Sequence, residues 1–198
     1  MSRVRRDLRR EFRLQEQDLL LLAIGSGFAT KGLDRSLLAL AALPEKLQAR
    51  VRMLIIGQDD AAFFQRMAER HGISGRVEFL GGRYDVPRFL QAADLLLHPA
   101  YAESGGIVLL EALLNGLPVL ASEVCGYSGY LARANAGELL PEPFSQAHYN
   151  ARLLALLEDP NQLAEFSANG LQFGPQADIF DLQERAVQHI VAAARNAR

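Results

Sequence analysis

The sequence predicts an α/β fold, a Rossmann-like doubly wound parallel sheet of about six strands with extra C-terminal helices. Three observations predict it. From Leu19 onward, short apolar runs alternate with helix-length amphipathic stretches, which is typical of βαβ units. Some runs are apolar throughout, such as residues 53–56, and this indicates strands covered on both faces. A chain of 198 residues can bury roughly 70% of its unfolded surface, so we expect one domain with a full core.

The predicted strands are apolar runs that stop at glycine, proline or polar residues. They cover residues 19–24, 51–56, 77–80, 94–98, 118–121 and 138–140. The amphipathic stretches between them predict helices over residues 32–43, 60–71, 86–92, 106–115 and 127–135. After Pro141 the pattern becomes all-helical, and breaks at Pro160 and Pro175 predict helices over residues 146–158, 161–169 and 178–194.

Composition and charge exclude several classes of protein. With 21 basic and 23 acidic residues the net charge is −2, whereas nucleic-acid-binding domains are normally strongly basic. The single cysteine, Cys125, cannot form an internal disulfide and agrees with a reducing compartment. The arginine-rich residues 3–13 precede no apolar segment with a cleavage site, and no apolar run approaches the roughly 18 residues of a membrane span. We therefore expect a cytoplasmic protein that binds no nucleic acid.

The loop after the first strand is glycine-rich and contains a lysine. Gly25 and Gly27 let the backbone approach a phosphate, and the helix N-terminus behind them favours an anion. Thr30 stands where a Walker A loop and a G-x-G-x-x-G motif each require glycine, so an NAD-dependent enzyme is disfavoured. Lys31 is one of only two lysines among 21 basic residues. It is a candidate anion ligand, and a solvated surface lysine is the alternative.

Two glutamates flank the start of the helix predicted after the fourth strand. Glu103 lies past the strand end, and the helix that begins near Gly105 presents free N–H groups. Glu111 lies roughly 9 Å further along that helix, at 1.5 Å per residue. Its helix is apolar on nearly every side, so we expect its carboxylate to need hydrogen bonds such as those of a ribose diol. A structural ion pair or contact with water is the alternative.

Three other polar residues follow predicted strands. Arg83 could contact a base or a phosphate, and a solvated turn residue is the alternative. A packed position is favoured for both His98 and Cys125. The four histidines show no metal-ligand spacing and the chain contains no D-x-D motif, so we expect no metal in catalysis.

The order of these motifs resembles the retaining glycosyltransferases of family 4. Glu103 and Glu111 form an E-x7-E pattern around a glycine-rich helix start, the Lys31 loop precedes it, and a Gly-Leu-Pro-Val segment follows at residues 116–119. The resemblance implies a GT-B fold, which has two Rossmann-like domains. The C-terminal domain, the half that this chain matches, binds most of the nucleotide-sugar donor.

The same resemblance implies a role for each matching residue. Lys31 corresponds to the lysine on the donor diphosphate, Glu103 to the glutamate on the sugar hydroxyls, and Glu111 to the glutamate on the ribose. Arg83 would lie by the uracil. Lys31 and Glu103 are therefore the implied catalytic residues. The remaining implied donor-binding residues, which act through their backbone, are Gly25, Gly27, Gly105, Gly106 and Ile107.

A narrower set of segments resembles the bacterial lipopolysaccharide-core glucosyltransferases of this family. These segments are residues 25–28, 31–36, 57–59, 93–101, 125–127 and 142–146. The likeness implies transfer of glucose, with retention, from UDP-glucose to an inner-core heptose. It also implies that no cofactor is required and that the full-length enzyme contacts the cytoplasmic face of the inner membrane as a peripheral protein.

Two departures from the family pattern shape the remaining expectations. Many members carry an arginine five residues before the lysine, and Ser26 occupies that position here, so part of the positive charge on the diphosphate must come from elsewhere. The N-terminal domain, which would hold the acceptor, has no counterpart in this sequence. We expect residues 1–18 to be a basic linker or helix from that domain, residues 19–175 to bind the donor, and residues 176–198 to pack towards the absent half.

An isolated domain of this kind is expected to bind UDP or UDP-glucose without turning the donor over. The alternative is a non-catalytic module that binds a nucleotide or a nucleotide-sugar.

Overall fold

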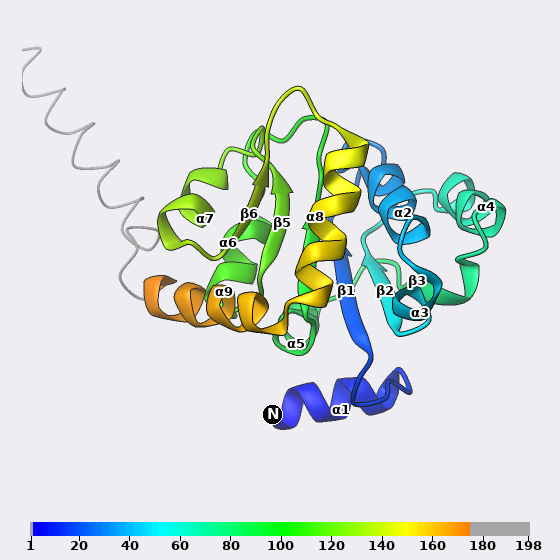
Figure 1. Ribbon diagram of the computed structural model, residues 1–198, viewed down its shortest axis with the longest axis horizontal. Coiled ribbons are helices and arrows are strands. Elements are labelled where there is room, and N and C mark those ends of the chain that lie inside the picture. Colours follow the sequence, from blue (N-terminus) through cyan, green and yellow to red (C-terminus); the bar gives the residue numbers. More distant parts are fainter. Residues whose placement is uncertain (1, 175–198) are drawn as a thin grey trace, which may run out of the picture.

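The computed structural model describes residues 2–174, which form one parallel six-stranded sheet with helices on both faces (Figure 1). The expected C-terminal helix over residues 178–194 lies outside the described part. The strands are β1 (Leu19–Ile24), β2 (Val51–Ile56), β3 (Val77–Phe79), β4 (Leu95–His98), β5 (Val119–Ser122) and β6 (Gly137–Leu140). All six predicted strands and their parallel pairing are confirmed.

The helices of the described region include all those predicted there, most with shifted ends, and one that was not predicted, the short α3 (Glu45–Gln48). They are α1 (Arg3–Glu11), α2 (Leu33–Ala41), α3 (Glu45–Gln48), α4 (Ala62–Arg70), α5 (Val86–Ala92), α6 (Ile107–Leu114), α7 (Ser128–Ala134), α8 (Gln146–Glu158) and α9 (Pro160–Phe173), with a 3-10 turn, η1 (Ser74–Arg76), before β3. The predicted helix over residues 32–43 ends early, and the short α3 follows Pro44 as a separate turn. Asp159 caps α9, and this helix extends four residues beyond its predicted end.

The strand order is β3-β2-β1-β4-β5-β6. In the sheet, the chain starts at the centre with β1 and adds β2 and β3 on one side. It then returns to the centre and adds β4, β5 and β6 on the other side. The reversal falls between β1 and β4, which pair through Leu21 with Leu95 and Leu22 with Leu96. In an open α/β sheet a ligand crevice forms at such a reversal, outside the carboxyl ends of the strands. The loops after β1 and β4 are therefore the expected walls of the site.

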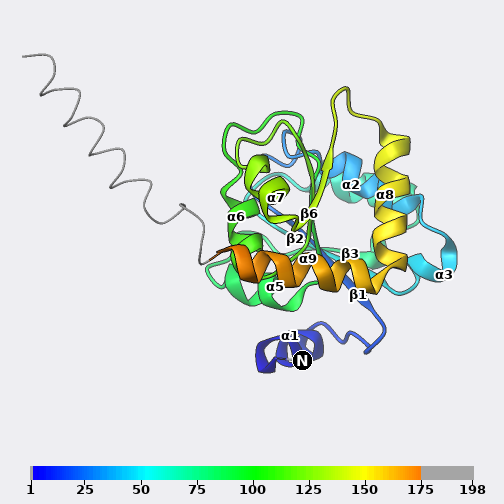
Figure 2. The same cartoon turned by 60° about the vertical axis from the view of Figure 1, so that its left-hand side comes forward.

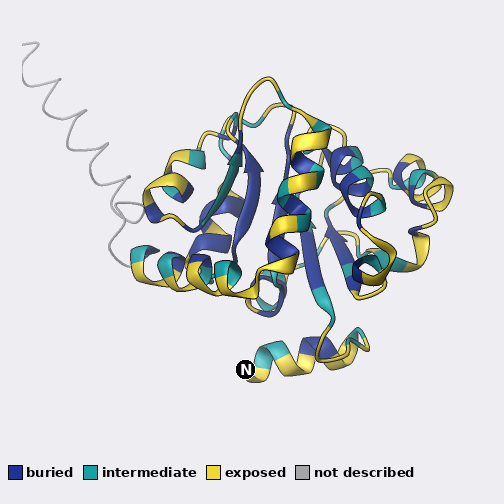
Figure 3. Ribbon diagram, viewed as in Figure 1, coloured by how far each residue is buried: buried dark blue, intermediate teal, exposed yellow. Residues whose placement is uncertain are grey.

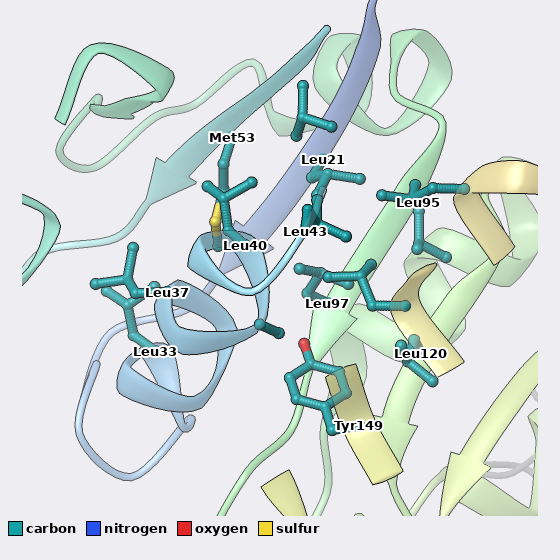
Figure 4. Packing of buried hydrophobic residues seen from close by; sticks show 14 of the residues in the cluster. Leu21, Leu33, Leu37, Leu40, Leu43, Met53, Leu95, Leu97, Leu120 and Tyr149 are labelled. Carbon is teal, nitrogen blue, oxygen red and sulfur yellow. The ribbon is translucent and has the colours of Figure 1, made fainter. Parts of the chain in front are cut away.

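The sheet has a hydrophobic core on each face, because successive strand residues point to opposite sides. One core joins Leu21 and Met53 of the strands to Leu37 of α2 and Tyr149 of α8 (Figure 4). The other core lies against α1, α5, α6 and α7 and includes Leu22, Leu54, Phe89 and Leu109. Figure 2 shows α2 and α8 on one side of the strands and α6 and α7 on the other, and Figure 3 shows the buried strands between them.

The N-terminal arginines belong to α1, which lies beneath the amino ends of the strands (Figure 1). Ser2 caps this helix, and Leu8 is fully buried against the rest of the fold. Arg5 forms an ion pair with Asp94 and donates hydrogen bonds to the carbonyl oxygens of Ala92 and Ala93. Asp94 in turn accepts a 2.7 Å hydrogen bond from the amide of Leu20 at the start of β1. Helix α1 is thus fastened to the amino end of the sheet.

Candidate functional site

The loops after β1 and β4 are held together at the carboxyl end of the sheet. The amide of Tyr101 donates to the carbonyl of Thr30 at 2.9 Å, which ties one loop to the other. Gly32 has φ of +71°, and a Cβ there would lie 2.0 Å from the carbonyl oxygen of Pro99. Only glycine permits both this backbone conformation and this close approach. The contact brings Lys31 of the first loop beside Glu103 of the second.

Lys31 and Glu103 form an ion pair through Nζ and Oε2. The Glu103 side chain is 10% exposed and that of Lys31 is 27% exposed, so the pair is mostly buried between the two loops. The second oxygen of Glu103 accepts a 3.2 Å hydrogen bond from the amide of Gly105. Burial favours the neutral acid, but the bonds from Lys31 and Gly105 outweigh it and lower the pKa of Glu103 below its usual value. The two residues implied as catalytic are thus direct partners.

His98 forms the floor beneath this pair. Its side chain is 2% exposed, as expected for a packed residue, and its Nε2 lies 3.5 Å from Oε2 of Glu103. Burial lowers the pKa of His98 because the imidazolium would lose its hydration there. The ring is therefore neutral at neutral pH and contributes no further positive charge to the crevice.

Cys125 is also packed, and it joins the Glu103 loop to the segment after β5. It forms an isolated parallel bridge with Glu103, and the amide of Gly126 donates to the Glu103 carbonyl at 3.2 Å. Burial raises the pKa of the thiol to about 11, so it is protonated at neutral pH. Because the thiolate is the nucleophilic form, the protonated Cys125 is not a nucleophile at neutral pH. Its contribution is the backbone bridge that holds the Glu103 loop.

The N-terminus of α6 lies next to Glu103. Gly106 precedes the helix with φ of +84°, and a Cβ there would come within 3.1 Å of Cγ of Glu103. No side chain caps this end of α6. The amides of Gly106 and Ile107 are therefore available to an anion, whereas the Gly105 amide is already bonded to Glu103. That these three amides face the donor stays a prediction.

Glu111 lies in the second turn of α6 and is exposed. Ile107 and Leu114, on the same face of the helix, are 59% and 36% exposed. The expectation that Glu111 sits in apolar surroundings was wrong, since no described element covers this face. Its carboxylate is open to water and needs no ligand to satisfy its hydrogen bonds. The argument from burial for a ribose contact therefore fails, and that contact stays a prediction from the family resemblance alone.

Arg83 lines an open pocket beside the β1 loop. The pocket has a volume of about 340 Å³, and its lining includes Gly25, Ser26, Gly57, Gln58, Gly82, Arg83 and Tyr84. Arg83 binds both carboxylate oxygens of Asp85, at 2.8 and 2.9 Å, and this ion pair lowers the pKa of Asp85 to about 2. Asp85 also accepts from Arg88, whose other nitrogen binds Glu11 of α1 at 2.6 Å. The Arg83 guanidinium is thus held in place rather than merely solvated.

Gly25 connects this pocket to the ion pair. It lines the pocket, has φ of +134°, and a Cβ there would touch Cε of Lys31 at 3.6 Å. Gly27 also has a positive φ, of +78°, and faces open space. The structure therefore places Gly25 between Lys31 and the pocket that Arg83 lines, whereas neither Gly27 nor Glu111 lines that pocket.

Arg35 supports the site, and the sequence analysis missed it. It is buried between the rings of Tyr101 and Phe144, with its guanidinium carbon 3.5 and 3.7 Å from their centroids. It donates to the carbonyl oxygens of Pro99 and Ala100 at 3.0 and 3.1 Å. These contacts fix the backbone that leads to Glu103. These partners are distant from Arg35 in the sequence, so no local pattern predicts the contacts. The sequence indicated Arg35 only as part of residues 31–36, one of the segments that carry the family resemblance.

Within residues 2–174, no group of three or more histidine, cysteine, aspartate or glutamate side chains is arranged to hold a metal ion. Metal-independent chemistry stays a prediction. In the same part of the chain, no helix combines the length and the apolar character that crossing a membrane requires.

A family model described as glycosyl transferases group 1 matches residues 4–173. The lipopolysaccharide glucosyltransferase WaaG of Escherichia coli K12 is 46% identical over 178 residues, which are 89% of this chain and 47% of WaaG. Seven further curated relatives, among them D-inositol 3-phosphate glycosyltransferases, are each matched over less than half their own length, as WaaG is. The resemblance to lipopolysaccharide glucosyltransferases is confirmed at the level of sequence.

Solved structures confirm the fold. The crystal structure of WaaG, a glycosyltransferase involved in lipopolysaccharide biosynthesis, matches with a TM-score of 0.90 and 43% identity over 94% of this chain and 50% of that one. Anabaena HepE in complex with UDP-glucose matches with a TM-score of 0.83 and 24% identity over 97% of this chain and 54% of that one. The chain thus has the fold of one Rossmann-like half of a two-domain glycosyltransferase.

Proposed function

The chain belongs to the glycosyl transferases group 1 family, and from this premise we propose that it is the donor-binding domain of a retaining, family 4 glucosyltransferase. Its donor is UDP-glucose, and the acceptor of the whole enzyme is the inner-core heptose of lipopolysaccharide. One observation carries the proposal: the Lys31–Glu103 pair lies in a mostly buried crevice at the uncapped N-terminus of α6. The names of two similar proteins support it, since WaaG is a lipopolysaccharide glucosyltransferase and HepE was crystallised with UDP-glucose.

The diphosphate of the donor takes the place of Glu103 as the partner of Lys31. A lysine ammonium and free helix amides are suited to phosphate oxygens, and both lie beside Glu103. Negative charge on the leaving UDP grows as the glycosidic bond breaks. Fixed positive groups therefore stabilise the transition state more than the ground state, which is the requirement for catalysis.

Glu103 orients the glucose once Lys31 has turned to the diphosphate. Its carboxylate is ionised at neutral pH and retains the Gly105 amide as a partner, so one oxygen is free to accept from sugar hydroxyls. Arg83 lies at the pocket that would take the uracil, and Glu111 would receive the ribose diol on the open face of α6. Ser26 supplies no positive charge, so Lys31 is the principal cation at the diphosphate.

Turnover requires the other half of the enzyme. The chain spans 47% of WaaG, and the acceptor is expected to bind in the half that WaaG has in addition. We therefore propose that residues 1–198 bind UDP and UDP-glucose without transferring glucose. The full enzyme would act without a metal or other cofactor, in the cytoplasm and at the cytoplasmic face of the inner membrane. A non-catalytic nucleotide-sugar-binding module is the second candidate, because the chain covers only the donor half.

Calorimetric titration of the chain with UDP, UDP-glucose, GDP and NAD, in the presence of a chelator, tests the proposal. Uridine nucleotides should bind, Lys31→Ala and Glu111→Ala should each weaken binding roughly tenfold, and the matched control Lys46→Ala should not. Lys46 is the other lysine of the chain and is exposed on α3. Preferential binding of NAD would contradict both candidate functions.

Fusing the chain to the N-terminal half of WaaG separates the two candidates. Glucose transfer from UDP-glucose by the fusion, absent from the fusion that carries Lys31→Ala, supports the enzyme. Tight UDP binding without transfer in a correctly folded fusion supports the module.

A further inference from the structure

We propose that a pocket at the amino ends of β2 and β3 binds a phosphate group. The pocket has a volume of about 200 Å³, and three arginines line it: Arg13 after α1, Arg52 of β2 and Arg76 of η1. Arg52 is the second residue of its strand, whereas Lys31 follows the end of β1. The pocket therefore lies at the opposite end of the sheet from the crevice that holds the Lys31–Glu103 pair.

The three arginines come to the pocket lining from three separate segments, and Arg13 is exposed. Arg52 is anchored by a hydrogen bond from Nη1 to the carbonyl of Gly75, which leaves its other N–H groups available. Arg52 and Arg76 are half-buried, and the floor beneath them is formed by apolar residues of β2 and β3. Planar guanidinium groups that converge on one small space match the geometry of phosphate oxygens.

The charge of the pocket is positive although the chain as a whole is slightly acidic. Glu78 is the acidic residue of the lining, against the three arginines. The chain carries a net charge of −2, so this cluster is a local feature and not a consequence of composition. An anion that enters it exchanges water for several charge-assisted hydrogen bonds.

The backbone at Arg13 shows that the local fold does not favour arginine at this position. Helix α1 ends with hydrogen bonds from Leu14 to the Arg9 carbonyl and from Arg13 to the Arg10 carbonyl, at 2.8 and 3.1 Å. In this helix-ending motif the left-handed position usually holds glycine. Arg13 occupies it with φ of +53°. A residue with a Cβ is disfavoured at this left-handed position, so arginine does not stabilise the end of α1. Its side chain instead supplies a positive charge beside the pocket.

The ligand is therefore a phosphate oxyanion, either the headgroup of an anionic lipid or a free phosphate. Both present the same tetrahedral oxygens to the three guanidinium groups. The two sources differ in whether the phosphate stands on a surface, and this difference can be measured.

A titration of the full chain with inorganic phosphate, followed by amide NMR shifts, tests the site. The titration uses the Lys31→Ala background, so that phosphate at the donor crevice does not contribute, with chloride at matched ionic strength as reference. Saturable shifts should cluster at Arg13, Gly75 and Arg76. Arg13→Gly and Arg52→Gln should each weaken binding about tenfold, and Glu78→Gln should strengthen it. The matched control Arg70→Gln, on the exposed end of α4, should have no effect.

Arg13→Gly distinguishes loss of the site from loss of the fold. Glycine fits the left-handed backbone better than arginine, so this variant should melt at the same or a higher temperature while it loses phosphate binding. Sedimentation with vesicles of phosphatidylcholine, with and without phosphatidylglycerol, identifies the source. Binding to the anionic vesicles that Arg13→Gly abolishes indicates a headgroup, and binding of inorganic phosphate alone indicates a free phosphate. Binding of neither probe, or binding that Arg13→Gly and Arg52→Gln leave unchanged, overturns the proposal.

Discussion

The two glutamates of the E-x7-E pattern lie in opposite environments, although a single helix connects them. Glu103 is 10% exposed, paired with Lys31 and bonded to the Gly105 amide, whereas Glu111 is exposed and lies between the exposed side chains of Ile107 and Leu114. The N-terminus of α6 is thus preorganised within the fold, while its second turn is open. Substitution of Glu103 should therefore change the stability of the protein. Substitution of the exposed Glu111 should change ligand binding alone.

Gly32→Ala should have the largest effect, because the preorganised region depends on the close contact of two loops. The added Cβ would lie 2.0 Å from the Pro99 carbonyl, and the residue would also keep φ of +71°. We expect a loss of at least about 3 kcal/mol in the free energy of unfolding, measured by urea titration. Gly27→Ala is the matched control, since φ there is +78° but nothing lies within 4 Å, so only the backbone cost of about 1 kcal/mol should remain. Equal losses in the two variants would show that the loop contact is not tight.

Lys31→Met should destabilise the chain by about 1–3 kcal/mol in the absence of nucleotide, because it leaves the Glu103 carboxylate mostly buried without its cation. Glu103→Gln in the same background should recover part of that loss, since the unpaired charge is then gone. Chemical unfolding of the two single variants and the double variant measures the coupling between the residues. Additive losses would mean that the pair contributes nothing to the fold.

The pH dependence of stability should separate the two glutamates. The folded-state pKa of Glu103 lies below its ordinary value of 4.5, so its stabilisation is fully present above that value and is lost as the pH falls through the folded pKa. Unfolding free energies measured from neutral pH down to about pH 3 should therefore fall less steeply in Glu103→Gln than in the parent chain. Asp85 and other carboxylates titrate in both proteins, and the difference between the two curves removes them.

Glu111→Gln should leave stability unchanged within about 0.5 kcal/mol, as expected for an exposed side chain that pairs with none of residues 2–174. Thermal and urea unfolding of the two proteins side by side provide the measurement. A loss above 1 kcal/mol would indicate that the second turn of α6 is built into the fold in solution and would remove the contrast with Glu103.

The sequence predicted the sheet well because its signals are local. Apolar runs such as residues 53–56 bury both faces of a strand, and the glycines that follow the runs, Gly25 and Gly57, mark where the strands end. The short α3 was missed because four residues are too few to show a helical period. The shifted helix ends have the same origin, since capping and tertiary contacts decide the last turn.

The site was predicted less completely because its environment is not local. Sequence motifs identified Lys31 and Glu103 separately, but their ion pair depends on the contact of Gly32 with Pro99, which joins distant loops. The expectation for Glu111 was wrong because apolar neighbours along a helix do not reveal which face another element covers. Arg35 was missed for a similar reason.

Arg35 gives the crevice a support that does not depend on an opposite charge. In the described part of the chain its guanidinium forms no ion pair, and two aromatic rings and two backbone carbonyls hold it instead. Dissolved salt screens a charge pair that is in part open to solvent, such as Lys31–Glu103, more than it weakens buried ring stacking and carbonyl hydrogen bonds. In concentrated salt the backbone before Glu103 should therefore keep its shape while the ion pair above it loosens. The crevice then becomes easier to enter without becoming less well formed.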